Sequence, residues 1–214
     1  MKTGSGGFGC FRTMRGSAFV FVLLTVFLGW GPGAAQSLTP ALDHARRQSI
    51  SEGRGLGGIR LGDTEEEIMK KLGGPPLRIG QSPDGARRDL IYAAVGPERE
   101  WGIVLQITLT LRQGGAEAIW LTVGRRPPAS HQYLGRTARG YLPGEPKERI
   151  LAIYGNPDET ITGPPGTDEI WWYRAEGLLV VPGEKQIRGE NQSKLAVVRP
   201  NLSLEELRRH VLGP

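Results

Sequence analysis

The chain repeats part of its own sequence. At an offset of 82 residues, residues 58–75 align with residues 140–157 without a gap. Four of the six identical positions are glycine or proline, which constrain the backbone directly and mark turns. The identical pairs are Gly58/Gly140, Gly62/Gly144, Glu66/Glu148, Ile68/Ile150, Gly73/Gly155 and Pro75/Pro157. We therefore expect two copies of one structural unit.

Each copy is predicted to open with a short helix. In the first copy, Thr64 and Glu67 form a capping-box pattern, and a glycine pair ends the apolar stripe. In the second copy, Pro146 stands where a helix start tolerates proline, and Gly155 begins the stop signal. We expect Gly73 or Gly155 to adopt a positive φ as the helix C-cap. Two turns of helix are not stable alone in water, so another element must cover them.

Runs rich in β-formers come after each helix and supply that cover. They occupy residues 89–95, 101–112 and 116–123 in the first copy, and residues 169–175, 177–181 and 194–198 in the second. Each copy is thus predicted as a helix packed on one face of an antiparallel meander. The expected fold class is α+β, with two tandem copies of short helices packed on an antiparallel β-meander.

The N-terminal region differs in composition from the rest of the chain. All five Phe lie within residues 1–35, which hold none of the 22 acidic residues. Basic residues precede an apolar run over residues 18–30, and small residues end the segment at Ala35, which is typical of a secretory signal peptide. The run is too short to span a membrane, and Cys10 precedes it, so neither a retained anchor nor a lipoprotein is expected. Export to the periplasm or beyond the cell is predicted, with the start at Met1 or Met14 left open.

The expected organisation of the chain rests on these signals. It comprises a signal peptide (residues 1–35), a flexible N-terminal segment (36–57), a first repeat (58–127), a second repeat with its linker (128–201) and a C-terminal helix (202–214). The flexible segment is expected to form at most one short helix over residues 41–48, because the stretch from Gly53 to Gly58 is rich in glycine.

Composition excludes several classes of function. Without residues 1–35 the chain has no cysteine, which removes disulfides, thiolate metal sites and cysteine nucleophiles. It then carries 24 basic against 22 acidic residues, a balance that argues against nucleic-acid binding. His44, His131 and His210 are scattered, and residues 65–67 place three glutamates where they complement a helix dipole. We expect no enzyme, metal, cofactor or small-molecule substrate, since no catalytic fingerprint is present.

Arginine occurs in pairs along the chain. The pairs are Arg46/Arg47, Arg87/Arg88, Arg125/Arg126 and Arg208/Arg209, each among acidic residues. This spread favours a solvated surface over an anion site, and a contact with peptidoglycan or an acidic polysaccharide stays open.

The repeated unit resembles the SmpA/OmlA (BamE-like) and beta-lactamase-inhibitor-protein superfamily. The resemblance rests on Gly58, Gly62, Glu66, Ile68, Leu72, Gly73 and Pro75, and on Gly140, Gly144, Glu148, Ile150, Tyr154, Gly155 and Pro157. Trp172 and Tyr173 are similar to an aromatic element that members carry in the strand after the helix. The resemblance implies an exported domain that binds proteins, and two copies are closer to the inhibitors. This chain lacks the lipoprotein cysteine of one branch and the disulfides of the other.

Aromatic side chains are the candidates for partner binding. With no Phe after residue 35, every remaining aromatic has a polar group, which suits half-buried interface positions. Strand alternation sends Trp172 to one face of the expected strand and Trp171 with Tyr173 to the other. One of these sets is expected on an open sheet face, and packing in the core stays the alternative. The predicted partner-binding residues are Trp171, Trp172, Tyr173, Trp120 and Trp101.

The sequence thus predicts an exported protein-binding module without catalytic activity. Two roles are open for it, an inhibitor of an extracytoplasmic enzyme or an envelope-assembly accessory. The alternative is an envelope structural or scaffold protein with no discrete ligand. Pull-down of a stoichiometric partner separates the two hypotheses.

Overall fold

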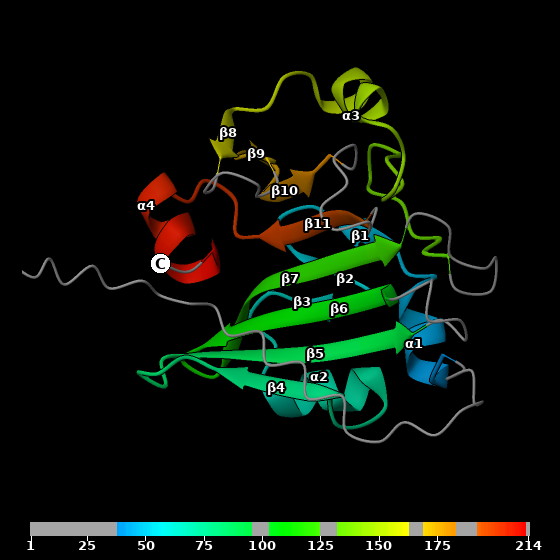
Figure 1. Cartoon of the computed structure of the whole chain (residues 1–214), viewed down its shortest axis with the longest axis vertical. Helices are drawn as coiled ribbons and strands as arrows, with labels where there is room; N and C mark the ends of the chain where they lie inside the picture. Colours follow the sequence, from blue (N-terminus) through cyan, green and yellow to red (C-terminus); the bar gives the residue numbers. More distant parts are fainter. Residues whose placement is uncertain (1–37, 96–102, 125–131, 163–168, 183–191, 213–214) are drawn as a thin grey trace, which may run out of the picture. The chain divides into compact units, whose positions relative to one another are not determined.

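The computed structural model describes residues 38–95, 103–124, 132–162, 169–182 and 192–212 (Figure 1). All of them belong to one compact unit, Gly33–Pro214. The protein is α+β, with a large antiparallel sheet and a few short helices. Within the described ranges, no helix has the length and apolarity needed to cross a membrane.

The first half of the described chain builds a small sheet, two helices and four long-sheet strands. In chain order these are α1 (Pro40–Ala45), β1 (Ile50–Ser51), β2 (Gly55–Leu56), β3 (Ile59–Arg60), α2 (Glu65–Leu72), β4 (Arg78–Gln81), β5 (Arg87–Val95), β6 (Ile103–Arg112) and β7 (Gly115–Gly124). The strands β1, β2 and β3 form their own three-stranded sheet.

The second half supplies one helix, four more strands and a C-terminal helical segment. These are α3 (Lys147–Tyr154), β8 (Glu159–Thr162), β9 (Glu169–Tyr173), β10 (Leu178–Val181), β11 (Gln192–Val198), α4 (Leu204–Leu207) and the π-helix η2 (Arg208–Leu212). The short strands β4 and β8 were not predicted, because each comes after the proline that ends its helix and neither shows clear alternation.

The eight-stranded sheet consists of two meanders that meet in the middle. Its order is β4-β5-β6-β7-β11-β10-β9-β8, and every neighbouring pair is antiparallel (Figure 1). The central pair joins β7 to β11, with a register that runs from Ala118 opposite Val198 to Gly124 opposite Gln192. One continuous sheet therefore crosses both halves of the chain.

The helix ends agree with the sequence signals. Thr64 caps α2, with its Oγ1 accepting from the Glu67 N–H at 3.3 Å and its own N–H donating to Glu67 Oε2 at 2.8 Å. Gly73 ends α2 with φ 74°, and Gly155 ends α3 with φ 77°. The predicted positive φ at these glycines is confirmed. At Gly73 a β-carbon would also lie 2.7 Å from the Ala41 Cβ, so α1 packs closely there.

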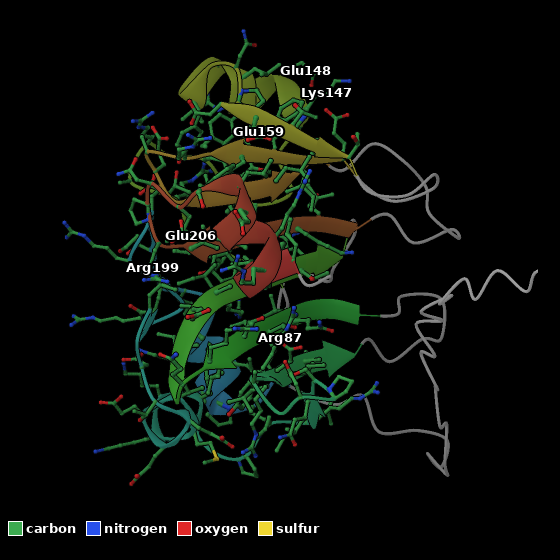
Figure 2. All side chains as sticks on the ribbon, turned by 90° about the vertical axis from the view of Figure 1, so that its left-hand side faces the viewer. Arg87, Lys147, Glu148, Glu159, Arg199 and Glu206 are labelled. Atoms are coloured by element: carbon green, nitrogen blue, oxygen red, sulfur yellow. The ribbon has the colours of Figure 1, made fainter. Side chains whose placement is uncertain are left out.

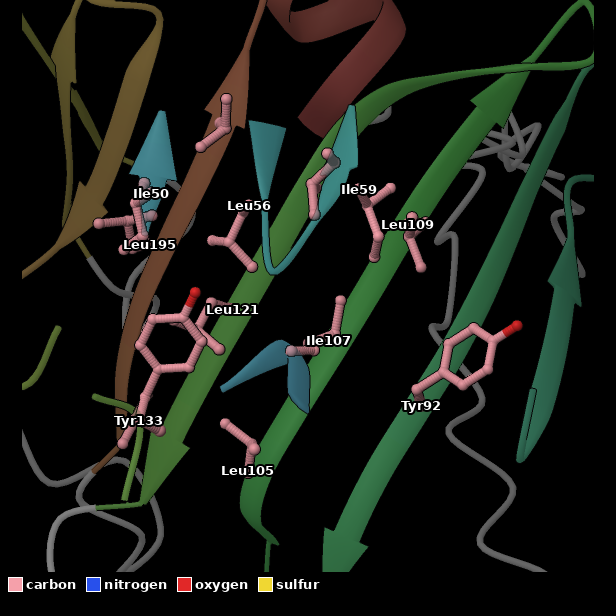
Figure 3. Packing of buried hydrophobic residues seen from close by; sticks show 14 of the residues in the cluster. Ile50, Leu56, Ile59, Tyr92, Leu105, Ile107, Leu109, Leu121, Tyr133 and Leu195 are labelled. Atoms are coloured by element: carbon pink, nitrogen blue, oxygen red, sulfur yellow. The ribbon is translucent and has the colours of Figure 1, made fainter. Parts of the chain in front are cut away.

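The main core lies between the sheet and the elements on one of its faces. Figure 3 shows Ile50, Leu56 and Ile59 of the small sheet packed over Ile107 and other residues of the large one. The same cluster includes Ile68 and Leu72 of α2, Ile150 of α3 and, from β9, Trp171 and Tyr173. Helices and small sheet together cover this face.

A second core lies on the opposite face of the sheet. Leu202, Leu207 and Val211 of the C-terminal segment cover strand residues there, and all three are buried. Their partners are Ala118, Ile161, Trp172, Leu179, Ala196 and Val198. Arg87, labelled in Figure 2, donates from Nη1 to the Val211 carbonyl at 3.2 Å. We expected only one sheet face to be packed, and the C-terminal segment corrects that expectation.

The N-terminal segment is ordered where we predicted flexibility. Residues 38–57 form α1 and two strands of the small sheet, with Leu42 and Leu56 buried in the main core. The Ile50 N–H donates to the Arg136 carbonyl at 2.9 Å, which ties the segment to the second half of the chain. The glycines make tight turns rather than loose chain: at Gly55 a β-carbon would lie 2.1 Å from the Ile59 carbonyl oxygen.

A tyrosine ties each helix end to the sheet. The Tyr92 hydroxyl donates to the Gly74 carbonyl at 3.3 Å, and the Tyr173 hydroxyl donates to the Gly155 carbonyl at 3.1 Å. Burial raises the pKa of both hydroxyls to about 12. The two bonds span the same separation along the chain, 18 residues.

We expect Tyr92→Phe and Tyr173→Phe each to lower the free energy of unfolding by about 1 kcal/mol. Phenylalanine keeps the ring packing and removes only the hydroxyl that satisfies a helix-end carbonyl. Urea unfolding of both variants measures the effect. A loss in one variant with none in the other contradicts the equivalence of the two bonds.

Candidate functional site

The structure buries three of the five aromatic residues predicted to bind a partner. Exposed fractions are 9% for Trp171, 0% for Trp172 and 2% for Tyr173. Alternation is as predicted, since Trp171 and Tyr173 face the main core and Trp172 faces the second core. Trp120 is half-buried beside the second core, and Trp101 lies outside the described residues. The predicted exposure of aromatic side chains on β9 is therefore wrong, because both sheet faces are covered there.

The environments of the two β9 indoles are those of packing residues. Trp171 donates from Nε1 to Glu169 Oε1 at 2.7 Å, within its own strand. Trp172 Nε1 is buried without a hydrogen-bond partner, and the Arg174 guanidinium carbon lies 4.8 Å from its ring centroid. Neither indole lines the depression described next.

An open depression lies at one end of the large sheet. Its volume is about 930 Å³, and its lining comes from within residues 48–62, from within residues 112–117 and from Arg199. The first stretch contains the small sheet, and the second contains the turn between β6 and β7. The N-terminal segment predicted to be flexible is thus what encloses this depression.

Backbone pairing holds the two main walls together. The Gly62 N–H donates to the Ala116 carbonyl at 2.8 Å, and the Ala116 N–H donates to the Asp63 carbonyl at 2.9 Å. Gly62 has φ 89°, and a β-carbon at Gly115 would lie 3.2 Å from the Gly62 oxygen. Glycine at these positions allows the close approach of the two backbone segments.

The charge of the lining is strongly positive. Among the described residues, Arg54, Arg60, Arg112 and Arg199 belong to it, against one acid, Glu117. Arg199, labelled in Figure 2 beyond the end of β11, lies 3.9 Å from Glu117, measured from Nη2 to Oε1. In the described part of the chain, the structure shows no ion pair for the other three arginines.

Acidic side chains near the depression are engaged elsewhere. Asp63 accepts from Lys71 Nζ at 2.5 Å and from the Arg60 N–H at 2.7 Å. Glu52 accepts from the Tyr154 hydroxyl at 2.7 Å, and Glu176 pairs with Arg139 at 2.8 Å.

The charge of Arg112 acts on the carboxylate of Asp84. Hydrogen bonds from Ser82 and Ala86 chiefly lower its pKa, and the charge of Arg112 contributes. Asp84 is fully exposed and already holds these two turn bonds, so it neutralises Arg112 only weakly.

The chemistry available in the depression is anion recognition. Guanidinium groups present planar forks of N–H donors that match carboxylate and phosphate oxygens. Among the described residues, no group of three or more His, Cys, Asp or Glu is placed to hold a metal ion. The three glutamates of residues 65–67 lie at the start of α2, where Glu67 completes the cap and Glu65 pairs with Arg88 at 3.1 Å.

Sequence reasoning missed the arginines of the depression. They are single residues far apart in the chain, whereas the sequence pattern singles out adjacent pairs. Arg88 and Arg209, from those pairs, are exposed and form ion pairs with carboxylates, as a solvated surface predicts, whereas Arg46 is buried and pairs with Asp43. Arg125 and Arg126 lie outside the described residues. No spacing rule finds the set, because only the tertiary fold gathers it.

Comparisons with known proteins give structural likeness alone. No family model matches the chain, and no curated protein matches it. A DUF4309 family protein, YjgB, from Bacillus subtilis is 12% identical with a TM-score of 0.40, covering 77% of this chain and 97% of its own. A cysteine-rich secretory protein, SAV1118, from Staphylococcus aureus is 10% identical with a TM-score of 0.39, covering 77% of this chain and 50% of its own.

Proposed function

We propose that this chain is an exported, non-catalytic protein-binding module that uses the arginine-lined depression as its binding surface. The observation that carries the proposal is the charge of that surface, four arginines against one glutamate in an open depression of about 930 Å³. Arginine is enriched in protein interfaces and among the residues that dominate binding energy. The signal-peptide pattern of residues 1–35 supports export.

The proposed architecture is a tandem pair of helix-plus-meander units. In support, α2 and α3 begin and end at positions that differ by the 82-residue offset of the sequence repeat. Each helix precedes four antiparallel strands, and each helix end is bonded to a strand tyrosine 18 residues further on, the two bonds being offset by 81 residues. This is also the arrangement that the resemblance to the SmpA/OmlA and beta-lactamase-inhibitor superfamily implies.

A protein partner fits the depression better than a small molecule does. Small-molecule sites are concave, mostly apolar and enclose most of their ligand. This depression is open and framed by glycine backbone and charged side chains. Arg54 and Arg60 are exposed at its rim, where they can reach a surface that does not enter the depression. An inhibitor and an envelope-assembly accessory both present such a surface to a partner.

The test is capture of a partner from a cell-envelope fraction by the immobilised protein. We expect the wild type to retain a stoichiometric protein, and the double variant Arg54→Glu/Arg60→Glu to lose it. The control is Arg78→Glu, because Arg78 is exposed on β4, away from the depression, and forms no ion pair within the described ranges.

Two outcomes contradict the proposal in different ways. If the wild type captures no protein, the chain is better described as an envelope scaffold with no discrete ligand. If the double variant captures the partner as well as the wild type does, the module binds through another surface. Melting temperatures of all variants establish that each is folded.

A further inference from the structure

The charges of the depression specify the chemistry of its partner. We infer that the partner contacts it with an acidic segment, a loop or tail that carries several aspartate or glutamate carboxylates. This inference rests on the proposed function and names the class of protein surface that the depression recognises. Its basis is how the arginines are placed, what they contact and what the lining lacks.

The arginines come from four different elements. Arg54 lies in the turn between β1 and β2, Arg60 ends β3, Arg112 ends β6, and Arg199 comes directly after β11. Separate parts of the fold therefore hold these four side chains. A ligand that satisfies several of them must present several negative groups, which a single carboxylate does not do.

The positive groups are accessible and the negative group is recessed. Arg54 and Arg60 are exposed, and the Arg199 side chain is 58% exposed. The Glu117 side chain is only 19% exposed. An approaching surface thus meets the guanidinium groups before the carboxylate. Electrostatic complementarity of this kind steers association and selects acidic partners over basic ones.

The arginines of the depression also retain donor capacity. Elsewhere in the described chain, arginines such as Arg136, Arg149 and Arg209 pair with carboxylates. Within the described residues Arg54 and Arg60 form no such pair, and both side chains are exposed. A partner's carboxylates would supply acceptors that the protein itself does not.

The lining argues against a nucleic-acid ligand. Its described residues include no aromatic side chain on which a base could stack, whereas single-stranded nucleic acids are usually held by such stacking. It does contain Leu61, partly exposed beside Arg60, which offers apolar contact to peptide side chains. An acidic polypeptide therefore matches both the charge and the surface of the depression.

The experiment measures binding of a fluorescent oligoglutamate peptide to the full chain by fluorescence anisotropy. We expect binding that weakens as salt rises, and no binding of an oligolysine peptide. Arg54→Gln/Arg60→Gln is expected to weaken binding by about tenfold or more, while the control Arg78→Gln leaves it unchanged. Glutamine keeps polarity and most of the side-chain length.

A second variant gives the opposite change. Glu117→Gln removes the single acid of the lining and releases Arg199 from its ion pair, so the peptide is expected to bind several-fold more tightly. A gain in affinity does not arise from misfolding. An unchanged or weaker affinity for a folded Glu117→Gln protein counts against the inference.

The remaining outcomes separate this inference from the proposed function. If a protein partner is captured from the envelope fraction but oligoglutamate does not bind, the inference is overturned and the proposed function stands. If inorganic phosphate or a sulfated polysaccharide binds at the arginines and oligoglutamate does not, the ligand is of another class and the inference is again overturned. If oligoglutamate binds but no partner is captured, the proposed function fails while the acidic specificity holds.

Discussion

Trp172→Ala is expected to lower the free energy of unfolding by about 3–5 kcal/mol, the usual cost of deleting a buried indole. Trp172 is fully buried and lies in the second core with Leu179, Val198 and residues of the C-terminal segment. Alanine would leave a cavity in the second core. Urea unfolding monitored by circular dichroism measures the change.

Trp120→Ala is the matched control for this prediction. Trp120 is also an indole beside the second core, but it is only half-buried, so its loss is expected to cost clearly less. If Trp172→Ala is destabilised no more than Trp120→Ala, the second core does not depend on Trp172.

Gly177→Ala is expected to cost about 3 kcal/mol or more, because backbone occupies the space of the new side chain. A β-carbon at Gly177 would lie 2.3 Å from the Val198 carbonyl oxygen and 2.9 Å from the Gly53 Cα. Gly177 also has φ 61°, which alanine adopts only with strain. The N-terminal segment packs against the turn before β10 at this point, so the clash displaces a wall of the depression.

Gly114→Ala separates the two causes. Gly114 has φ 84°, but nothing lies within 4 Å of a β-carbon placed there. Only the backbone strain acts, and a loss of about 1 kcal/mol is expected. Thermal and urea unfolding of both variants test the comparison. Equal losses would show that strain, and not close packing against Gly53, explains Gly177.

The local structure was largely predictable because its signals are local. The cap residues Thr64 and Glu67 and the stop at Gly73 lie within one short stretch, and the helix between them is as expected. Alternation in residues 103–112 placed Leu105, Ile107, Leu109 and Leu111 on one face, and all four are buried in the main core. These patterns reflect physics that acts over a few residues.

The faces of the sheet could not be predicted, because they depend on distant parts of the chain. The alternation of side chains along β9 predicts which residues share a sheet face with Trp172, but it does not predict that residues 202–212 cover that face. The N-terminal segment shows the same limit. Its glycine-rich sequence predicts a flexible segment, yet Gly53 packs against Gly177, which is far away in the sequence. The arginines of the depression converge for the same reason and left no local signal.

The pairing of β7 with β11 sets an order of events during folding. During synthesis the N-terminal residues appear first, so β4, β5, β6 and β7 can pair early. The edge of β7 that faces β11 finds its native neighbour only when residues 192–198 have been made. Until then a ten-residue strand presents unpaired backbone groups, which are a template for aggregation. The last strand therefore closes the sheet at its centre and not at its rim. Truncations that remove β11 leave that edge open permanently, so such fragments should associate rather than fold.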